Sequence, residues 1–282
     1  MDNSAVRTEN LTKVYKDFWR RKTVPALINL NLNIERGEIF GLLGPNGSGK
    51  TTTVKLLLGL LHPTNGKSWL LGCPSDDLKV KGRIGFLPEE SYLYKFLNAE
   101  EILDFYGKLF RIPRKERKIR IDALIHNVGL NIHRKRPLSQ YSKGMLRRIG
   151  LAQAIINNPE LIILDEPTSG LDPIGNHEIK DLIIEFKNQG KTVVLCSHLL
   201  ADVQSICNRI AIINKGVLQI TGNVRDLLSQ KDVIEFLVKN LSHHDTHAVE
   251  AFIRSRNGNI VSVNHPVSTL EELFVNIVQG RR

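Results

Sequence analysis

The sequence has no long apolar run of the kind that crosses a membrane. No uninterrupted apolar stretch among its 282 residues approaches the roughly 20 residues that a membrane-spanning helix needs. The first residues, Met1-Asp2-Asn3-Ser4, also lack the charged-then-apolar layout of a secretion signal. Internal repeats and low-complexity segments are absent too. These absences argue against an integral membrane protein and predict a soluble chain in the cytosol.

Cysteine is scarce, and the three residues are Cys73, Cys196 and Cys207. Their spacing matches neither a metal site nor a redox pair. Two of them stand in apolar stretches, so we expect reduced thiols that pack in the core. The cysteines therefore predict no metal or redox chemistry for this chain.

Aromatic residues are few, and they do not interleave regularly with the two basic clusters at 20–22 and 111–120. A surface that stacks on nucleic-acid bases needs such interleaving. The net charge of +10 still fits a protein that works near phosphate, whether of a nucleotide, a nucleic acid or an anionic membrane surface. The alternative is that these clusters are solvated loops and helix faces.

One glycine-rich segment follows an apolar stretch at 39–43 and precedes another that begins at Val54, an order that predicts strand, loop and helix. Glycines in the loop let the backbone curl around a polyphosphate, with its N–H groups at the positive end of the helix. Lys50 would then reach the β- and γ-phosphates, and Thr51 would hold Mg²⁺. The segment predicts a nucleotide site made of Gly44, Pro45, Asn46, Gly47, Ser48, Gly49, Lys50, Thr51 and Thr52.

Two adjacent acids follow the apolar run at 161–164, which is typical of a strand buried on both faces. Asp165 and Glu166 stand at its end, and Pro167 stops it. Packing does not explain two acids at this place. Asp165 would hold Mg²⁺ through water, and Glu166 would polarise the water that attacks the γ-phosphate.

Two other strand candidates also end in polar side chains. The strand at 84–87 leads to Glu89, which could bind Mg²⁺ or its water, since the carboxyl ends of parallel strands face the ligand. A solvated loop glutamate is the alternative. The strand at 191–196 leads to His198, which could donate a hydrogen bond to a γ-phosphate or play a structural role.

Two predicted helix starts and one aromatic side chain are the remaining candidate features of the sequence. Asn98 and Glu101 form a capping pair, and a helical region continues to Gly129 as an insertion in the sheet. Ser142 stands where a second helix would begin, so free N–H groups would face a ligand there, unless Ser142 is an ordinary cap. Tyr15, at the end of a strand predicted at 5–15, could stack on a base or pack in the core.

These pieces occur in the order found in the nucleotide-binding subunits of ATP-binding-cassette (ABC) transporters, which the chain resembles over residues 5–225. The family's Leu-Ser-Gly-Gly-Gln signature is here Tyr141-Ser142-Lys143-Gly144-Met145, and Glu89 stands where the Q-loop glutamine is usual. The matching positions are Tyr15, the Walker A loop 44–52, the Q-loop residue Glu89, the signature residues Ser142 and Gly144, the Walker B acids Asp165 and Glu166, the D-loop 169–172 and the switch residue His198.

The resemblance implies an α/β fold of the P-loop NTPase, ABC-ATPase type. We expect a mostly parallel core sheet with an N-terminal antiparallel β subdomain and an inserted α-helical subdomain at about 98–158. This ATPase domain would cover residues 1–224. A small α+β accessory region would cover 225–282, with strands at 232–238 and 260–264, a helix at 247–255 and a last helix from Ser268.

The resemblance also implies an ATP-hydrolysing subunit with ATP and Mg²⁺ as cofactors and Lys50, Glu166 and His198 as catalytic residues. Two subunits would form an ATP-dependent head-to-tail homodimer, in which Ser142 and Gly144 of one touch the γ-phosphate held by Lys50 of the other. The dimer would drive a separate transmembrane permease from the cytoplasmic face of the inner membrane. The strings at 87–90 and 269–274 resemble the branch that exports drugs, polysaccharides and lipids.

Two alternatives remain open from the residues. One is a non-transport ABC ATPase that acts on nucleic acid or ribosomes, which only the charge of +10 favours. Such proteins usually carry a long coiled coil or a second cassette, and this chain has neither, so we expect no nucleic-acid partner. The other is a nucleotide-gated binding module with little turnover, which the unusual signature string allows.

Overall fold

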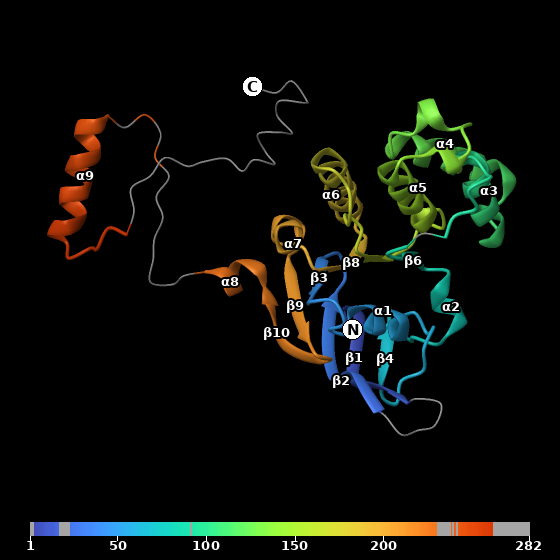
Figure 1. The fold of residues 1–282 in the computed structure, drawn as a ribbon, viewed down its shortest axis with the longest axis horizontal. Helices are drawn as coiled ribbons and strands as arrows, with labels where there is room; N and C mark the ends of the chain where they lie inside the picture. The colour runs from blue at the N-terminus through green and yellow to red at the C-terminus, as the bar shows by residue number, and fades with distance from the viewer. Residues whose placement is uncertain are drawn as a thin grey trace. The chain divides into compact units, whose positions relative to one another are not determined.

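The computed structural model of the protein describes residues 3–16, 23–90, 92–229, 238, 240 and 242–261. The chain separates into two compact units, residues 1–227 and 228–282. This boundary lies close to residue 224, where the sequence predicts the end of the larger domain. The first unit contains both sheets (Figure 1) and all the candidate site residues that the sequence singles out.

The core of the first unit is a six-stranded sheet with the order β10-β9-β3-β8-β7-β6. Neighbouring strands pair in parallel, except that β10 runs antiparallel to β9 at one edge. The mostly parallel α/β core that the sequence predicts is therefore confirmed. Its strands are β3 (Ile39–Leu43), β6 (Ile84–Leu87), β7 (Leu161–Asp165), β8 (Thr192–Ser197), β9 (Arg209–Asn214) and β10 (Val217–Asn223).

The strands of this sheet are apolar along their length because both faces of the sheet are covered. In β7, Ile162 and Leu164 join one hydrophobic core, and Leu161 and Ile163 join the other. Side chains alternate between the faces of a strand, so a strand with two covered faces needs a continuous apolar run. The core with Ile162 continues into the helices, and the core with Leu161 continues into α1 and the second sheet.

The second sheet is antiparallel along its length, with the order β2-β1-β4-β5, and confirms the predicted N-terminal β subdomain. In β2, Leu30, Leu32 and Ile34 are buried and the residues between them are exposed. This alternation is what a strand with one covered face requires. Its strands are β1 (Ser4–Lys16), β2 (Thr23–Glu35), β4 (Asn65–Leu70) and β5 (Cys73–Pro74).

A helical insertion separates β6 from β7, as the sequence predicts (Figure 1). The side chain of Asn98 accepts a hydrogen bond from the N–H of Glu101, and the Glu101 side chain accepts one from the Asn98 N–H. Pro113 divides the expected helical region in two. The insertion consists of α3 (Ala99–Leu109), α4 (Arg114–Asn127), α5 (Lys143–Ile155) and short 3-10 turns at Asn131–His133 and Leu138–Gln140.

The remaining helices of the chain follow strands or loops already described. None of the helices in the described ranges combines the length and apolar character that a membrane crossing requires. Cys196 and Cys207 are buried and Cys73 is half-buried, all as free thiols. Burial raises the pKa of Cys207 to about 12. The helices outside the insertion, up to residue 228, are α1 (Lys50–Leu57), α2 (Leu78–Lys81), α6 (Pro173–Asn188), α7 (Leu200–Ile206) and α8 (Val224–Leu228).

In the second unit the described residues include α9 (His243–Ser255). This helix begins four residues before His247, where the sequence predicts its start, because the Ser242 side chain accepts a hydrogen bond from the Asp245 N–H and caps it. Residues 260 and 261 are not in a strand. The strand expected at 232–238, apart from Val238, and the helix expected from Ser268 lie outside the described residues.

Candidate functional site

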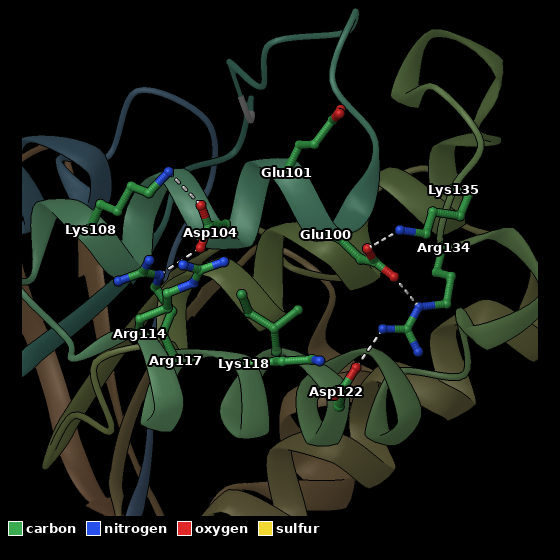
Figure 2. Close-up of a pocket in the computed structure, with 11 residues that line it drawn as sticks. Glu100, Glu101, Asp104, Lys108, Arg114, Arg117, Lys118, Asp122, Arg134 and Lys135 are labelled. Carbon is green, nitrogen blue, oxygen red and sulfur yellow. Dashed lines mark hydrogen bonds and ion pairs between the residues drawn. The ribbon is translucent and has the colours of Figure 1, made fainter.

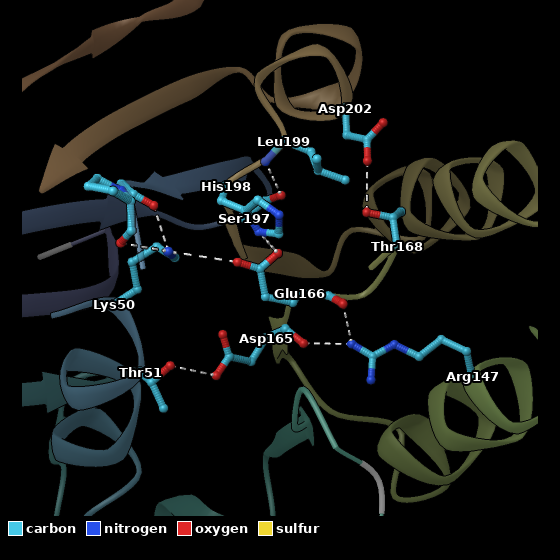
Figure 3. A network of polar contacts seen from close by, with 12 residues as sticks. Lys50, Thr51, Arg147, Asp165, Glu166, Thr168, Ser197, His198, Leu199 and Asp202 are labelled. Carbon is cyan, nitrogen blue, oxygen red and sulfur yellow. Dashed lines mark hydrogen bonds and ion pairs between the residues drawn. The ribbon is translucent and has the colours of Figure 1, made fainter. Parts of the chain in front are cut away.

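The polar residues that the sequence singles out follow strands whose carboxyl ends meet at one edge of the core sheet. Leu43 of β3 pairs with Ser197 of β8, and Asp165 of β7 pairs with Cys196 of β8. Because these strands are parallel, the segments that follow them emerge side by side. The glycine loop, the two acids and His198 therefore share one site (Figure 3).

The glycine loop between β3 and α1 has a shape that requires glycine. Gly47 and Gly49 have φ angles of 77° and 113°, which L side chains rarely adopt. A Cβ on Gly49 would lie 2.6 Å from the carbonyl oxygen of Ala26 in β2, and one on Gly44 would lie 2.2 Å from that of Ile213 in β9. The loop is thus held tightly against both sheets, with the first N–H groups of α1 at its end.

Lys50, the first residue of α1, is buried beside this loop. Its Nζ donates a hydrogen bond to the carbonyl oxygen of Gly44 at 2.6 Å and lies 3.4 Å from that of Pro45. The same ammonium lies 3.7 Å from Oε1 of Glu166 (Figure 3). A cation at a helix N-terminus, facing a loop of backbone N–H groups, creates a positive site for an anion such as phosphate.

Asp165 ends β7 and faces α1. Its Oδ2 accepts a hydrogen bond of 3.2 Å from the Thr51 hydroxyl, and the residue is only 3% exposed. Burial raises the pKa of Asp165 above its usual value, and the nearby carboxylates of Glu166 and Glu89 raise it further. A divalent cation would reverse this effect, because it stabilises the charged carboxylate.

Glu166 is held in a strained backbone conformation. Its φ angle is 49°, in the left-handed region, which costs a non-glycine residue about 1–2 kcal/mol. Its N–H donates to the carbonyl oxygen of Cys196, and its Oε2 lies 2.8 Å from Nδ1 of His198. The turn thus directs the carboxylate of Glu166 between Lys50 and His198, two residues far from it in sequence.

Two buried polar atoms at this site have no hydrogen-bond partner within the described chain: Oγ of Ser48 and Oδ1 of Asp165. Leaving a buried polar atom unpaired costs about 1–3 kcal/mol. A phosphate oxygen would accept from the Ser48 hydroxyl, and Mg²⁺ would bind the Asp165 oxygen beside Thr51. The residues present therefore fit a nucleotide with its Mg²⁺.

Other residues that the sequence selects lie outside this group. Tyr15 is 40% exposed, and the ammonium of Lys13 lies 5.4 Å from its ring centroid. Glu89 has an exposed side chain, and its carbonyl oxygen accepts a hydrogen bond from Arg147. In the described part of the chain no hydrogen bond joins either residue to the glycine loop. Of the remaining loop residues, Thr52 is half-buried, and the exposed ones are Pro45 and Asn46.

The signature residues stand at the start of α5, in the helical insertion. Oγ of Ser142 accepts a hydrogen bond of 3.2 Å from the Met145 N–H, which confirms the predicted N-cap. Ser142 is exposed and Gly144 is half-buried. Within the described residues, neither makes a hydrogen bond to the glycine loop of its own chain.

Sequence reasoning missed two buried polar residues that surround the site. Arg147 of α5 donates hydrogen bonds to the backbone of the turns after β6 and β7. Asp202 of α7 accepts from the Thr168 hydroxyl at 2.8 Å and from the Asn176 amide at 3.0 Å. It thereby ties the helix after His198 to the segment after Glu166. Both are charged residues within helices, and no motif in the sequence distinguishes them from surface residues.

A cavity of about 720 Å³ lies in the helical insertion rather than at the glycine loop (Figure 2). Its wall is charged, but most charges are paired across it. Glu100 pairs with Arg134 and Lys135, and Asp104 pairs with Arg117. No residue of the strand-end group lines this cavity.

Comparison with known proteins identifies the family. The family model described as ABC transporter matches residues 27–169. An uncharacterised ABC transporter ATP-binding protein of Synechocystis is 41% identical, over 99% of this chain and 86% of that protein. The linearmycin resistance ATP-binding protein LnrL of Bacillus subtilis is 36% identical, over 80% of this chain and 71% of that protein.

Solved structures agree with this result. The cbiO1 subunit of Clostridium perfringens, part of the ABC transporter complex cbiONQ, superposes with a TM-score of 0.73 and 27% identity, over 81% of this chain and 92% of that one. An ATP-binding cassette solved as a dimer in a post-hydrolysis state, with ADP and phosphate, gives a TM-score of 0.71 and 29% identity, over 78% and 99% of the two chains. The chain therefore belongs to the ABC transporter family, as one of its ATP-binding and ATP-hydrolysing subunits.

Proposed function

We propose that Lys50 binds the β- and γ-phosphates of ATP, that Glu166 is the general base of hydrolysis, and that His198 contacts the γ-phosphate. The observation that carries this assignment is the contact of Glu166 with both Lys50, at 3.7 Å, and His198, at 2.8 Å. A carboxylate between a phosphate-binding cation and an imidazole can take the proton of an attacking water. Thr51 and Asp165 would hold Mg²⁺, which neutralises developing charge on the phosphates.

The nearby residues also limit where the proton can go. Glu166 is 5% exposed, and the side chains of Lys50 and His198 contact its carboxylate. His198 is exposed at the outer side of the pair, where its ring can reach both Glu166 and solvent. This arrangement supports a path for the proton away from the γ-phosphate after Glu166 accepts it.

We infer that two copies of the chain form a head-to-tail dimer around ATP. The signature residues support this proposal: Ser142 is exposed and Gly144 is half-buried, and no hydrogen bond in the described residues joins either to the glycine loop of its own chain. The solved dimeric cassette with ADP and phosphate supports it as well. Each ATP would then lie between Lys50 of one copy and Ser142 of the other, so that binding joins the copies and hydrolysis releases them.

The dimer is tested with Glu166→Gln, which is expected to retain ATP because it keeps the phosphate contacts but cannot accept the proton. With Mg-ATP it should elute at twice the monomer mass in size exclusion with light scattering, and without nucleotide it should elute as a monomer. Adding Ser142→Arg should abolish the dimer, because the larger side chain fills the space for the phosphate. Ser255→Arg, an exposed site in α9, is the matched control and should leave the dimer intact. A nucleotide-bound monomer of Glu166→Gln would contradict the homodimer.

We further infer a separate transmembrane permease that this subunit drives from the cytoplasmic face of the inner membrane. An aromatic face formed by Tyr92, Tyr94, Phe96 and Phe105 supports this inference. Tyr92 and Phe96 are 83% and 75% exposed, and the Tyr94 ring lies 5.6 Å from that of Phe105. Exposed aromatic clusters of this kind mark protein interfaces. The relative cbiO1 belongs to a transporter complex.

Replacing two residues of the aromatic face is expected to release the subunit from membranes. The double change Tyr94→Ser with Phe96→Ser should lower the membrane-bound fraction about tenfold, since aromatic anchors dominate such interfaces. Its ATP hydrolysis in solution should stay unchanged, because neither residue contacts the strand-end site. Ile132→Ser, which is 94% exposed in the same insertion, is the control. Equal membrane binding of the double variant and wild type would refute this docking face.

We propose export as the direction of transport. The resistance function in the name of the Bacillus subtilis relative supports it, as do the sequence strings at 87–90 and 269–274. Inside-out membrane vesicles supplied with ATP would accumulate the cargo of an exporter. Loss of the cargo from such vesicles would instead show import.

A further inference from the structure

Arg147, on the inner side of α5, has a guanidinium that none of the roles above uses. The residue is 7% exposed. Its three nitrogen atoms donate five hydrogen bonds of 2.6 to 2.9 Å, and every acceptor is a backbone carbonyl. Figure 3 shows the two bonds to Asp165 and Glu166. The acceptors are the carbonyl oxygens of Pro88, Glu89, Asp165, Glu166 and Pro167.

No carboxylate in the described residues forms an ion pair with this guanidinium. Burial lowers the pKa of Arg147 to about 10, against the opposing effect of Asp165, Glu89 and Glu166 nearby, so the group remains charged at neutral pH. Burying such a charge is costly. Five charge-assisted hydrogen bonds in a fixed planar fork offset this cost, and only arginine has that many donors. The carbonyl oxygens of the turns around Arg147 are therefore arranged to bind a guanidinium group.

The bonded carbonyls include those on both sides of the Glu166 α-carbon. Nη2 donates to the oxygens of Asp165 and Glu166, and Nε donates to that of Pro167. Fixing these peptide planes holds Glu166 at its φ of 49°, which a free turn would leave. That conformation directs the Glu166 carboxylate to Lys50 and His198.

The same guanidinium reaches a second turn, and Arg147 belongs to the helix that begins after Ser142. Nη1 donates to the oxygens of Pro88 and Glu89, in the turn after β6 that leads to the aromatic face. Arg147 also stands five residues after Ser142, about one and a half turns along α5. A shift of the α5 start or of the β6 turn must therefore move the carbonyls that hold Glu166, or break bonds to them.

We propose that Arg147 is a positioning residue for ATP hydrolysis: it holds the Glu166 carboxylate in its reactive orientation and makes that orientation depend on the place of the signature helix. The effect of Arg147 on catalysis depends on the proposed role of Glu166 as the general base of hydrolysis. The link to Ser142 depends on the proposed dimer. All five acceptors of Arg147 are backbone carbonyls, so it acts through the backbone of Glu166.

The test separates turnover from binding. Arg147→Gln should lower kcat about 100-fold, the loss expected when a catalytic group is misplaced by about 1 Å. Arg147→Lys keeps the charge but has too few donors for all five carbonyls, so kcat should fall about tenfold. The Kd for Mg-ATP, measured with a fluorescent analogue, should stay within about threefold of wild type in both variants, because the glycine loop is untouched. Arg148→Gln is the matched control, since Arg148 contacts Val128 and Glu178 instead of these turns.

A second measurement decides whether Arg147 acts through Glu166. In the Glu166→Gln background, adding Arg147→Gln should leave the residual hydrolysis rate unchanged, since the carboxylate that it positions is gone. A further 100-fold loss in that background would overturn the proposal, and so would a wild-type kcat in Arg147→Lys. If Arg147→Gln does not fold, the kcat of Arg147→Lys serves as the test. The ATP-dependent dimer of Glu166→Gln, measured in parallel, tests the dimer separately.

Discussion

Replacing Glu166 with glutamine is expected to lower kcat for ATP hydrolysis about 1,000-fold, within the range for loss of a general base. Glutamine has nearly the same shape and can still contact Lys50 and His198, which lie 3.7 and 2.8 Å from the carboxylate oxygens. It cannot accept a proton from water. Phosphate release under saturating Mg-ATP measures the loss, and a titration with a fluorescent ATP analogue should give a Kd within about threefold of wild type.

The control for this change is Glu116→Gln on α4, whose carboxylate pairs with Arg120 on the surface. It should keep the wild-type kcat, because it removes a carboxylate far from the strand-end site. The general-base assignment fails if Glu166→Gln keeps more than about a tenth of the wild-type rate. It also fails if the loss comes entirely from weaker ATP binding, since the proposed role is in the chemical step.

Replacing Lys50 with alanine should lower kcat/KM about 1,000-fold, the upper range for removing one donor that stabilises developing charge. The ammonium is the buried cation of the glycine loop, where it contacts Gly44 and lies beside Glu166. Its loss removes positive charge from both bound ATP and the transition state. We therefore expect a weaker Kd for Mg-ATP together with a lower kcat, in contrast to the isolated kcat effect of Glu166→Gln.

Lys55→Ala provides the comparison for Lys50→Ala, because Lys55 is an exposed lysine on the same helix. It removes the same charge five residues away and should retain wild-type binding and turnover. Isothermal titration of Mg-ATP and steady-state kinetics measure both variants. Wild-type affinity and kcat/KM in Lys50→Ala would show that the loop binds the phosphates without its lysine.

Much of the fold is predictable because its signals are local. The glycine loop, the Asn98–Glu101 capping pair and the Ser142 cap each depend on residues within a few positions, and the structure has all three features. The apolar run at 161–164 predicts a strand with two covered faces, and β7 is buried along its length. Local rules predict the ends of elements less well. The cap at Ser242, for example, lengthens α9 beyond the helix expected from His247.

The site is predictable only in part. Lys50, Asp165, Glu166 and His198 stand out because each follows a buried strand, and the structure brings them together. Contacts of Tyr15 and Glu89 with a ligand stay predictions. Arg147 has no signal in the sequence, since its acceptors are backbone carbonyls that any residue would supply.

The sequence by itself determined which residues have the chemistry of this protein: a glycine loop with a lysine, and carboxylates and a histidine at strand ends. Tertiary structure decided which of them touch. Lys50, Glu166 and His198 meet because β3, β8 and β7 are neighbours in the sheet, although they are far apart in the chain. Strand order depends on how the whole core packs, so no local pattern encodes the 2.8 Å contact of Glu166 with His198 or the five hydrogen bonds of Arg147.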